Sequence, residues 1–277
     1  MIQDIYPHFL NNRFTEAAIA TNDNDFIFVF RNDKILLRQT GDELEIPTKK
    51  YFKGTLESAV YLFSLDNSRC YLAGDSVLPE DESFVFYEMT FFRTARQKEI
   101  AWASLVAHQI MHWYDQNQFC GKCGSSMSHK TDERALVCTE CKNTVYPRIS
   151  PAIIVAIICG NKILLAKGVN FRGGFYSLIA GYADIGESLE ETVVREVKEE
   201  VGIDVFNIRY YKSQPWPLSG SMMIGFIAEA DDTRPITIDE KEIAGAAWFE
   251  RGSLPQHSPS EISIAGEMIE RFESGEL

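Results

Sequence analysis

Three glutamates near the middle of the C-terminal half have the spacing of a metal site. Glu196, Glu199 and Glu200 stand at positions i, i+3 and i+4, so one face of a helix would carry all three carboxylates. Like charges at this spacing destabilise an isolated helix by roughly 0.2–0.5 kcal/mol per pair. Hard cations such as Mg²⁺ or Mn²⁺ prefer oxygen ligands and would offset this repulsion. We therefore predict a divalent-metal site here; a solvated acidic helix face is the alternative.

Signals on both sides of these glutamates predict the helix that would position them. Ser188 and Glu191 form a capping box, which typically starts a helix, and Gly202 stands where a C′ glycine would end it. An apolar stripe beside the acidic face is formed by Val193, Val194, Val197 and Val201. Such a stripe would hold the acidic face in a fixed orientation against a sheet.

Four cysteines form a second group with the spacing of metal ligands. They are arranged as two Cys-x-x-Cys pairs separated by fourteen residues: Cys120, Cys123, Cys138 and Cys141. Paired knuckles of this kind are typical of a tetrahedral structural zinc site, and four thiolates leave no open position for catalysis. Disulfides, which are rare in cytosolic proteins, and a redox pair are the alternatives. We expect one structural Zn²⁺ per chain, and Gly124 fits a tight knuckle turn.

Two histidines also have a spacing that could bind a metal ion. His108 and His112 are at i and i+4 on a helix predicted over residues 95–115. No Glu-x-x-His pattern surrounds them. We therefore interpret both as helix-surface or packing residues.

The segment 181–203 resembles the signature of the Nudix hydrolases. The fixed positions of that signature are matched by Gly181, Glu187, Arg195, Glu196, Glu199, Glu200 and Gly202. The resemblance implies cleavage of a nucleoside diphosphate linked to another group, with Glu196, Glu199 and Glu200 as catalytic ligands of Mg²⁺ or Mn²⁺. Glu242 falls where the family places a further acidic ligand or base. Glu187 and Arg195 are expected to pair and to position the loop.

Three further features resemble the NADH pyrophosphatase subgroup of that family. They are Ser213-Gln-Pro-Trp-Pro217 followed by Ser221, Tyr146-Pro-Arg148, and a zinc ribbon just before the catalytic domain. The resemblance implies hydrolysis of NADH or NAD⁺ to nicotinamide mononucleotide and AMP, and also removal of NAD caps from RNA 5′ ends. A Nudix hydrolase for ADP-ribose or another nucleoside diphosphate derivative is the first alternative, and a regulatory module that binds without cleaving is the second.

Five residues are predicted to bind the substrate: Tyr146, Tyr182, Gln214, Trp216 and Ser221. Aromatic faces stack favourably on bases, although core packing is the alternative for each aromatic residue. Leu218 and Ser219 replace an aromatic residue and a proline of the subgroup motif. This departure concerns the preference for nicotinamide more than the pyrophosphatase chemistry.

The net charge of −13 argues against non-specific binding to nucleic acid or to an anionic membrane. Bound metal ions can still attract a phosphate-bearing substrate. Basic residues of the cysteine module leave an RNA contact there as an alternative to ordinary surface charge: Lys122, Lys130, Arg134, Lys142 and Arg148. With no signal-peptide pattern at the N-terminus and no apolar run long enough to span a bilayer, we expect a cytoplasmic protein without a membrane partner. The subgroup resemblance implies a homodimer.

The pattern of elements predicts an α/β protein with three parts. We expect a β-rich N-terminal domain ending in a helix (1–115), a zinc ribbon (116–145) and a catalytic domain (146–277). The catalytic domain is predicted to be an α/β/α sandwich with a mixed sheet, which also resembles the Nudix fold. Its predicted strands are 152–159, 162–166, 205–212, 221–230 and 244–250, and its last helix opens with the capping box 258–261. The strands predicted for the N-terminal domain are 25–30, 34–37, 58–65, 69–72 and 83–92.

Overall fold

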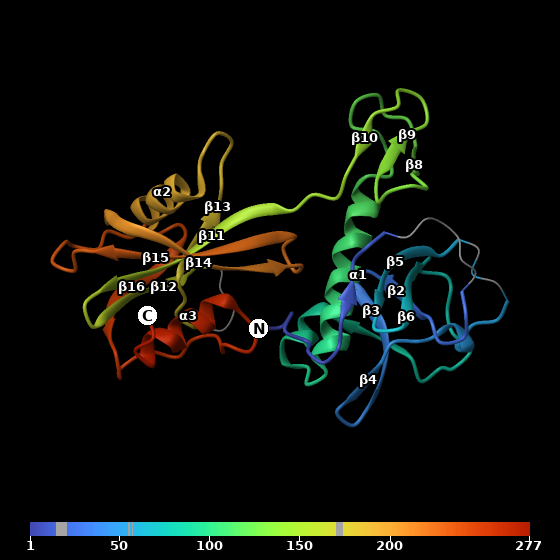
Figure 1. Ribbon diagram of the computed structural model, residues 1–277, viewed down its shortest axis with the longest axis horizontal. Helices are drawn as coiled ribbons and strands as arrows, with labels where there is room; N and C mark the ends of the chain where they lie inside the picture. The colour runs from blue at the N-terminus through green and yellow to red at the C-terminus, as the bar shows by residue number, and fades with distance from the viewer. Residues whose placement is uncertain (15–20, 55, 57, 170–173) are drawn as a thin grey trace. The chain divides into compact units, whose positions relative to one another are not determined.

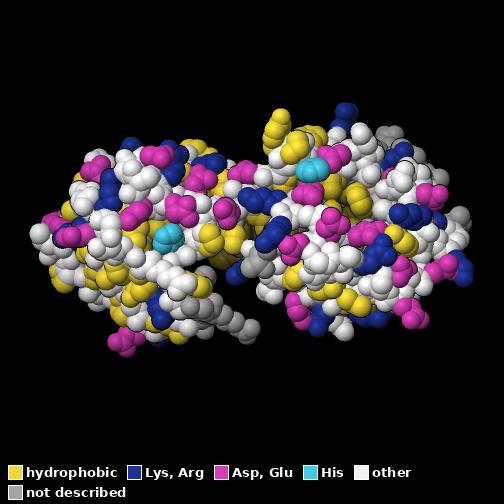
Figure 2. Space-filling view, turned by 90° about the horizontal axis from the view of Figure 1, so that it is seen from below, with side chains coloured by type: hydrophobic (Ala, Val, Ile, Leu, Met, Phe, Trp, Pro, Cys, Tyr) yellow, Lys and Arg dark blue, Asp and Glu magenta, His cyan; other side chains and the backbone are white. Residues whose placement is uncertain are grey.

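The computed structural model describes residues 1–14, 21–54, 56, 58–169 and 174–277. The chain forms two compact units, Ile2–Arg148 and Ile149–Leu277, and Met1 packs with the second (Figure 1). Acidic and basic side chains are mixed over the face seen in Figure 2. Within the described ranges, no helix is both long and apolar enough to cross a bilayer.

The C-terminal unit is built on a mixed sheet of six strands. These are β11 (Ser150–Cys159), β12 (Lys162–Gly168), β13 (Ile179–Tyr182), β14 (Val205–Trp216), β15 (Ser221–Ala230) and β16 (Ile243–Glu250). Their order is β14-β15-β11-β12-β16, with β13 beside β11. The pair β11–β15 is parallel and the other pairs are antiparallel. The predicted hairpin at Gly160-Asn161 is confirmed, because β11 and β12 pair through Cys159 and Lys162.

Two helices, α2 (Leu189–Val201) and α3 (Ile264–Glu273), cover opposite faces of this sheet (Figure 1). The buried valines of α2 join a core with Ile153, Val155 and Ile157. The apolar side of α3 joins a separate core with Ile154 and Ala156. This division follows from β11, where successive side chains point to opposite faces. The predicted α/β/α sandwich with a mixed sheet is confirmed.

The last helix begins later than predicted. Ser258 and Glu261 do not cap it; α3 starts at Ile264, and Ser263 is its N-cap. Ser263 Oγ accepts a hydrogen bond from Gly266 N at 3.2 Å. The carbonyl oxygens of residues 258 and 259 approach Gly266 so closely that a Cβ there would lie 2.4 Å from each. The expected first turn is therefore a loop folded against the start of the helix, and Gly266 makes room for it.

The N-terminal part of the first unit is a seven-stranded sheet. Its strands are β1 (Leu10–Asn11), β2 (Phe26–Arg31), β3 (Lys34–Thr40), β4 (Glu43–Glu45), β5 (Val60–Leu65), β6 (Ser68–Ala73) and β7 (Val85–Glu88). They follow the order β1-β5-β6-β2-β3-β4, with β7 beside β3. Helix α1 (Lys98–Gln116) follows, close to the prediction, and the 3₁₀ helix Lys49–Tyr51 lies between β4 and β5.

The strand predicted over 83–92 is only partly correct. The extended chain ends at Glu88, and Met89–Thr94 is a 3₁₀ helix. Met89 and Phe92 are 6% and 1% exposed. Side chains three residues apart lie on the same side of a 3₁₀ helix, so this turn buries both, whereas a strand would point them to opposite faces.

The cysteine module forms a small antiparallel sheet of three strands, β8 (Met127–His129), β9 (Leu136–Cys138) and β10 (Thr144–Val145). It belongs to the same compact unit as the N-terminal sheet. Arg134 links the two, because its Nη1 donates to Asn12 Oδ1 at 3.2 Å and its Nη2 donates to the carbonyl oxygen of Leu62.

Candidate active site

Helix α2 has the two ends that the sequence predicts. Ser188 Oγ accepts from Glu191 N at 3.3 Å, and Glu191 Oε2 accepts from Ser188 N at 2.8 Å, which completes the capping box. Gly202 ends the helix in the left-handed conformation with φ 73°. Of the predicted valine stripe, Val193, Val197 and Val201 are buried, whereas Val194 is 44% exposed. Because both ends are fixed and three of the four valines are buried, the acidic face of α2 has a defined orientation on the sheet.

Arg195 is the centre of an ion-pair network on this helix. Its Nε and Nη2 donate to the two carboxylate oxygens of Glu187 at 2.6 and 3.0 Å. Its Nη1 donates to Glu196 Oε1 at 2.8 Å and to Glu199 Oε2 at 3.0 Å, and its Nη2 also reaches the Tyr182 carbonyl at 2.9 Å. The expected pairing of Glu187 with Arg195 is confirmed, and the pair ties the loop before α2 to the helix.

Glu187 has further partners that the sequence does not single out. It accepts hydrogen bonds from Asp184 N and Thr192 Oγ1, each at 3.1 Å. Arg195 first, and then the Asp184 amide, lower the pKa of Glu187 to about 2. A threonine one turn into a helix is unremarkable in a sequence, and only the folded loop shows that Thr192 faces this carboxylate.

The predicted metal ligands differ in exposure. Glu196 and Glu200 are 9% and 8% exposed, whereas the Glu199 side chain is 60% exposed. Burial, together with the nearby charges of Glu196, Glu242 and Glu199, raises the pKa of Glu200 to about 8. Burial also raises the pKa of Glu196, against the opposing effect of Arg195. A partly buried group of mutually repelling carboxylates is chemically suited to a hard divalent cation, which would neutralise it.

Glu242 reaches this group through the loop before β16. The Glu200 carbonyl accepts from Asp239 N at 3.1 Å, and the Asp239 carbonyl accepts from Glu242 N at 3.1 Å. The loop is therefore hydrogen-bonded to the last turn of α2. The negative charge of Glu242 raises the pKa of both Glu196 and Glu200, although Glu242 lies 42 positions after Glu200 in the sequence.

Gly181 is required where β13 passes α2. A Cβ built at this position would lie 2.0 Å from Glu196 Cδ. Glu196 thus lies directly against the backbone of β13, and any side chain at position 181 would displace it. The closeness of this contact gives a steric reason for a glycine fifteen residues before the buried glutamate.

Three of the predicted substrate-binding residues lie at strand ends of the C-terminal unit. Tyr182 ends β13 and is 52% exposed. Trp216 ends β14, is partly buried, and pairs with Ser221 at the start of β15. Ser221 is 2% exposed, with its Oγ 2.8 Å from Ser219 Oγ. Leu218 and Ser219 lie in the turn that joins these two strands.

The other two predicted substrate-binding residues have partners within the fold. Gln214 is fully buried; its Nε2 donates to Ile262 O at 3.0 Å and its Oε1 accepts from Ile264 N at 2.7 Å. This gives the amide a structural role at the start of α3. Tyr146 belongs to the other unit, is 54% exposed, and donates from its hydroxyl to Glu133 Oε1 at 3.1 Å. Contacts of the five residues with a substrate stay predictions.

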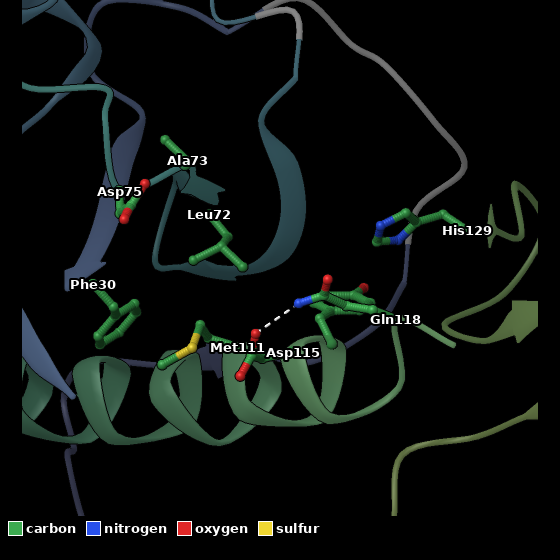
Figure 3. A pocket seen from close by; sticks show the side chains of 10 residues that line it. Phe30, Leu72, Ala73, Asp75, Met111, Asp115, Gln118 and His129 are labelled. Carbon is green, nitrogen blue, oxygen red and sulfur yellow. Dashed lines mark hydrogen bonds between the residues drawn. The ribbon is translucent and has the colours of Figure 1, made fainter. Parts of the chain in front are cut away.

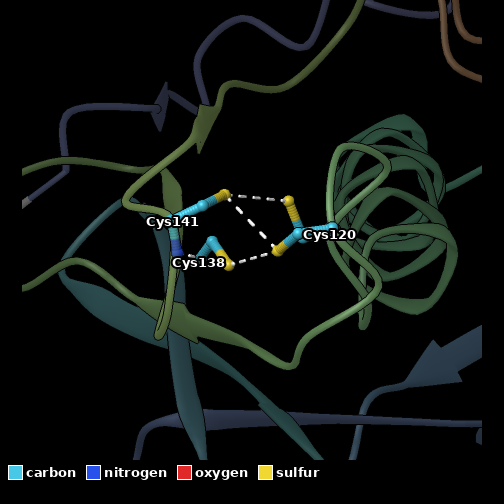
Figure 4. A group of neighbouring side chains, drawn as sticks. Cys120, Cys138 and Cys141 are labelled. Carbon is cyan, nitrogen blue, oxygen red and sulfur yellow. Dashed lines mark hydrogen bonds between the residues drawn. The ribbon is translucent and has the colours of Figure 1, made fainter.

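The four predicted zinc ligands come together in the cysteine module (Figure 4). Their sulfur atoms all lie within 4.8 Å of one another, with Sγ–Sγ distances of 3.4 to 3.7 Å where they are closest. Four thiolates at about 2.3 Å from one Zn²⁺ would lie about 3.8 Å apart. Both knuckles end in a left-handed residue, Gly124 with φ 77° and Lys142 with φ 60°. The cluster fits a closed, structural zinc site.

Comparisons with known proteins match nearly the whole described chain. Residues 149–272 match the NUDIX domain, residues 24–113 the NADH pyrophosphatase-like rudimentary NUDIX domain, and residues 115–146 the NADH pyrophosphatase zinc ribbon domain. A solved NUDIX hydrolase from Nitrosomonas europaea aligns with 57% of this chain and 90% of its own, at 21% identity and a TM-score of 0.49.

Curated relatives carry the name NAD-capped RNA hydrolase NudC. The one from Erwinia tasmaniensis is 43% identical over 162 residues, which cover 58% of this chain and 61% of the relative. The one from Pseudomonas aeruginosa is 43% identical over 166 residues, which cover 60% of this chain and 59% of the relative. The aligned part of the chain thus spans about three fifths of the length of these relatives. With all three domain matches in the expected order, the chain belongs to the Nudix family and carries the zinc ribbon and rudimentary domain of its NADH pyrophosphatase branch.

Proposed function

We propose that this protein hydrolyses the pyrophosphate bond of NADH and NAD⁺, giving nicotinamide mononucleotide and AMP. The observation that carries the proposal is the carboxylate group at α2, in which Glu196 and Glu200 are buried and the nearby charge of Glu242 raises the pKa of both. A module that only binds nucleotides gains nothing from such repulsion, whereas a metal-dependent hydrolase needs these ligands. The domain matches and the name of the relatives support the dinucleotide as substrate.

In this proposal Mg²⁺ or Mn²⁺ is held by the four glutamates Glu196, Glu199, Glu200 and Glu242. A bound divalent ion supplies charge neutralisation on the diphosphate and activation of water for in-line attack. The chain itself orients the ligands. Gly181 has no Cβ and so leaves room for the Glu196 carboxylate, and Arg195 donates hydrogen bonds to Glu196 and Glu199. The Asp239 hydrogen bond holds the Glu242 loop beside the end of α2.

The same chemistry extends to NAD at the 5′ end of RNA, as the name of the relatives suggests. Two of the five basic residues of the ribbon give this extension little support. Arg134 is turned toward Leu62 and Asn12, and Lys130 pairs with Glu133 and Asp132. We therefore assign the recognition of a capped RNA to its NAD end, with Tyr182 and Trp216 as the aromatic candidates for stacking on a base.

The test is product analysis with Mg²⁺ or Mn²⁺, offering NADH, NAD⁺, ADP-ribose and NAD-capped RNA in parallel. The wild-type protein should release AMP and reduced mononucleotide from NADH. Glu200→Gln should lower that rate by at least about 100-fold, because removing a metal ligand's charge costs several kcal/mol of transition-state stabilisation. Glu190→Gln is the matched control, since it makes the same change at an exposed position of the same helix.

Two results would contradict the proposal. Nucleotide binding without cleavage by the wild-type protein would make the chain a regulatory binder. A preference for ADP-ribose over NADH would mean that Leu218 and Ser219, in the turn after Trp216, change the specificity. In that case, the relative rates of Leu218→Phe with NADH and ADP-ribose would show whether the absence of an aromatic ring at position 218 causes the change in specificity.

The proposal includes a homodimer that works in the cytoplasm, where reduced thiols can hold zinc. The assembly rests on the resemblance to the subgroup. Sedimentation velocity of the full chain tests it directly, and a monomer at the concentration used for the activity assay would exclude it.

A further inference from the structure

Three metal-binding side chains converge in the N-terminal unit, and none of them belongs to either predicted metal site. Asp33 Oδ1 lies 2.9 Å from His108 Nε2 and 2.6 Å from His112 Nε2, and the two Nε2 atoms are 3.1 Å apart. In the described part of the chain, this cluster and the four cysteines are the two groups whose ligand atoms all lie within 4.8 Å of one another.

The three atoms are close enough together for one ion to contact all of them. Imidazole nitrogens and carboxylate oxygens bind tetrahedral Zn²⁺ at about 2.0–2.2 Å, so two of them lie about 3.3–3.6 Å apart around the ion, and the three side chains would have to move apart by less than about 1 Å to hold it. Hydrogen bonding explains the triangle less well. Each Nε2 carries at most one proton, so at most two of the three contacts are hydrogen bonds. A cation in contact with all three atoms would satisfy every one of them.

The backbone at Asp33 is unusual for an aspartate. Asn32 and Asp33 form the two-residue turn between β2 and β3, with φ 48° and 65°. Such a turn needs positive φ at both positions, and glycine is the favoured second residue because it has no Cβ. Aspartate at this position costs about 1 kcal/mol relative to glycine. The carboxylate that this turn presents to the two histidines gives a reason for the less favourable residue.

The charges in the cluster also suit a cation. Burial lowers the pKa of His108, whose side chain is 8% exposed, which favours a neutral imidazole with a free lone pair. The pKa of Asp33 is lowered despite the opposing effect of burial, because His108 and His112 favour its anionic form. The Asp33 and His112 side chains are 63% and 38% exposed, so water can reach the remaining coordination positions.

The cluster joins the β2–β3 turn to α1, next to a region where the sheet and α1 do not pack closely. A hollow of about 310 Å³ lies between the sheet and the second half of α1, where Phe30 and Leu72 lie across from Met111 (Figure 3). The Phe30 ring also contacts the His108 ring, with centroids 5.5 Å apart. An ion held by Asp33 on the sheet and two histidines on α1 would fasten the helix next to this hollow. The same helix ends at Gln116, four positions before Cys120 of the ribbon.

We propose that Asp33, His108 and His112 bind a second Zn²⁺, which clips α1 to the β2–β3 turn. Three protein ligands leave at least one position to water, so this zinc is bound more weakly than the zinc of the four cysteines. His108 and His112 were expected from the sequence to be surface or packing residues; the partner that completes the site is 75 residues away from His108 and is visible only in the fold.

The experiment compares zinc binding by four full-length chains that all carry Glu200→Gln, in excess Mg²⁺. They are the otherwise wild-type chain, Asp33→Gly, His112→Gln and Asn32→Gly. Glycine fits the positive φ of the turn, so Asp33→Gly removes the carboxylate without straining the backbone. Asn32→Gly is the matched control, because it makes the same change one residue earlier and keeps the ligand. Zinc per chain is measured by mass spectrometry after equilibrium dialysis.

The otherwise wild-type chain and Asn32→Gly should each bind one equivalent more than Asp33→Gly and His112→Gln. In those two variants the extra site should weaken by more than about 10-fold, since even changing a partner of a ligand typically costs that much. Co²⁺ gives an independent readout: the extra site should add d–d absorption without the thiolate charge-transfer band of the cysteine site. Equal zinc contents in all four chains, or an equal loss in Asn32→Gly, would overturn the proposal.

Discussion

The cysteine cluster of the ribbon and the glutamate cluster of α2 differ in what holds their ligands together. The ribbon has three strands of two or three residues, and its buried side chains are few. By contrast, α2 is fastened by a capping box and by valines buried on a six-stranded sheet. The sheet keeps Glu196 and Glu200 close in spite of their repulsion. We therefore expect the ribbon to need its ion in order to fold, whereas the fold around α2 would be present before the proposed ion binds.

The largest effect that would test this contrast is removal of the zinc. Cys138→Ser should abolish zinc binding to the cysteine cluster and unfold residues 115–146 locally, because structural zinc sites contribute on the order of 10 kcal/mol of binding free energy to folding. Hydrogen exchange measured along the chain should show lost protection in the ribbon and unchanged protection in α2 and its sheet. Cys159→Ser, outside the cluster, is the matched control. A ribbon that keeps its protection in Cys138→Ser would mean that Arg134 and α1 hold it without metal.

The sequence predicts the gathering of the four cysteines, and the helix that carries three of the glutamates, better than the surroundings of either set, for a physical reason. Each of the two predicted sets consists mostly of residues within a few positions of one another, as in α2, where helical period and caps fix the geometry locally. The capping box at Ser258 failed because the competing cap at Ser263 is chosen by packing of the preceding loop on Gly266. The contact of Asp33 with the two histidines depends on the β2–β3 turn meeting α1, which no local pattern specifies.

A smaller effect is expected from crowding the glutamate cluster. Gly181→Ala places a Cβ where Glu196 Cδ lies, so Glu196 must move away from β13. We expect kcat to fall by about 10- to 100-fold, and stability to fall by about 1–3 kcal/mol, as overpacking usually costs. Gly245→Ala in β16 is the control, because its nearest neighbour would be Tyr176 at 4.0 Å. Full activity in Gly181→Ala would show that Glu196 tolerates displacement and is dispensable as a ligand.

The smallest expected effect is a gain of stability in Glu200→Gln. It tests most directly whether the carboxylates of the proposed ion site destabilise the fold when no ion is bound. The pKa of Glu200 is about 8 in the fold against 4.5 for an ordinary glutamate. The folded state therefore holds a proton at Glu200 that the unfolded state loses between these values, so the contribution of Glu200 to stability is largest below pH 4.5 and is lost as pH rises toward 8. Without added Mg²⁺, Glu200→Gln should be more stable than wild type by on the order of 2 kcal/mol at pH 8 and nearly equal to it at pH 4.5. Chemical denaturation at both pH values measures the difference.

Saturating Mg²⁺ should reverse that order at pH 8. An ion that binds only the folded state stabilises wild type by RT ln(1 + [L]/Kd), about 2.7 kcal/mol at a hundredfold excess over Kd, whereas Glu200→Gln binds it poorly. Glu190→Gln, at an exposed position of α2, should follow the wild-type curve with and without the ion. If Glu200→Gln is no more stable than wild type without Mg²⁺ at pH 8, the carboxylates do not repel one another in the fold. The contrast with the ribbon would then lie in the choice of metal alone.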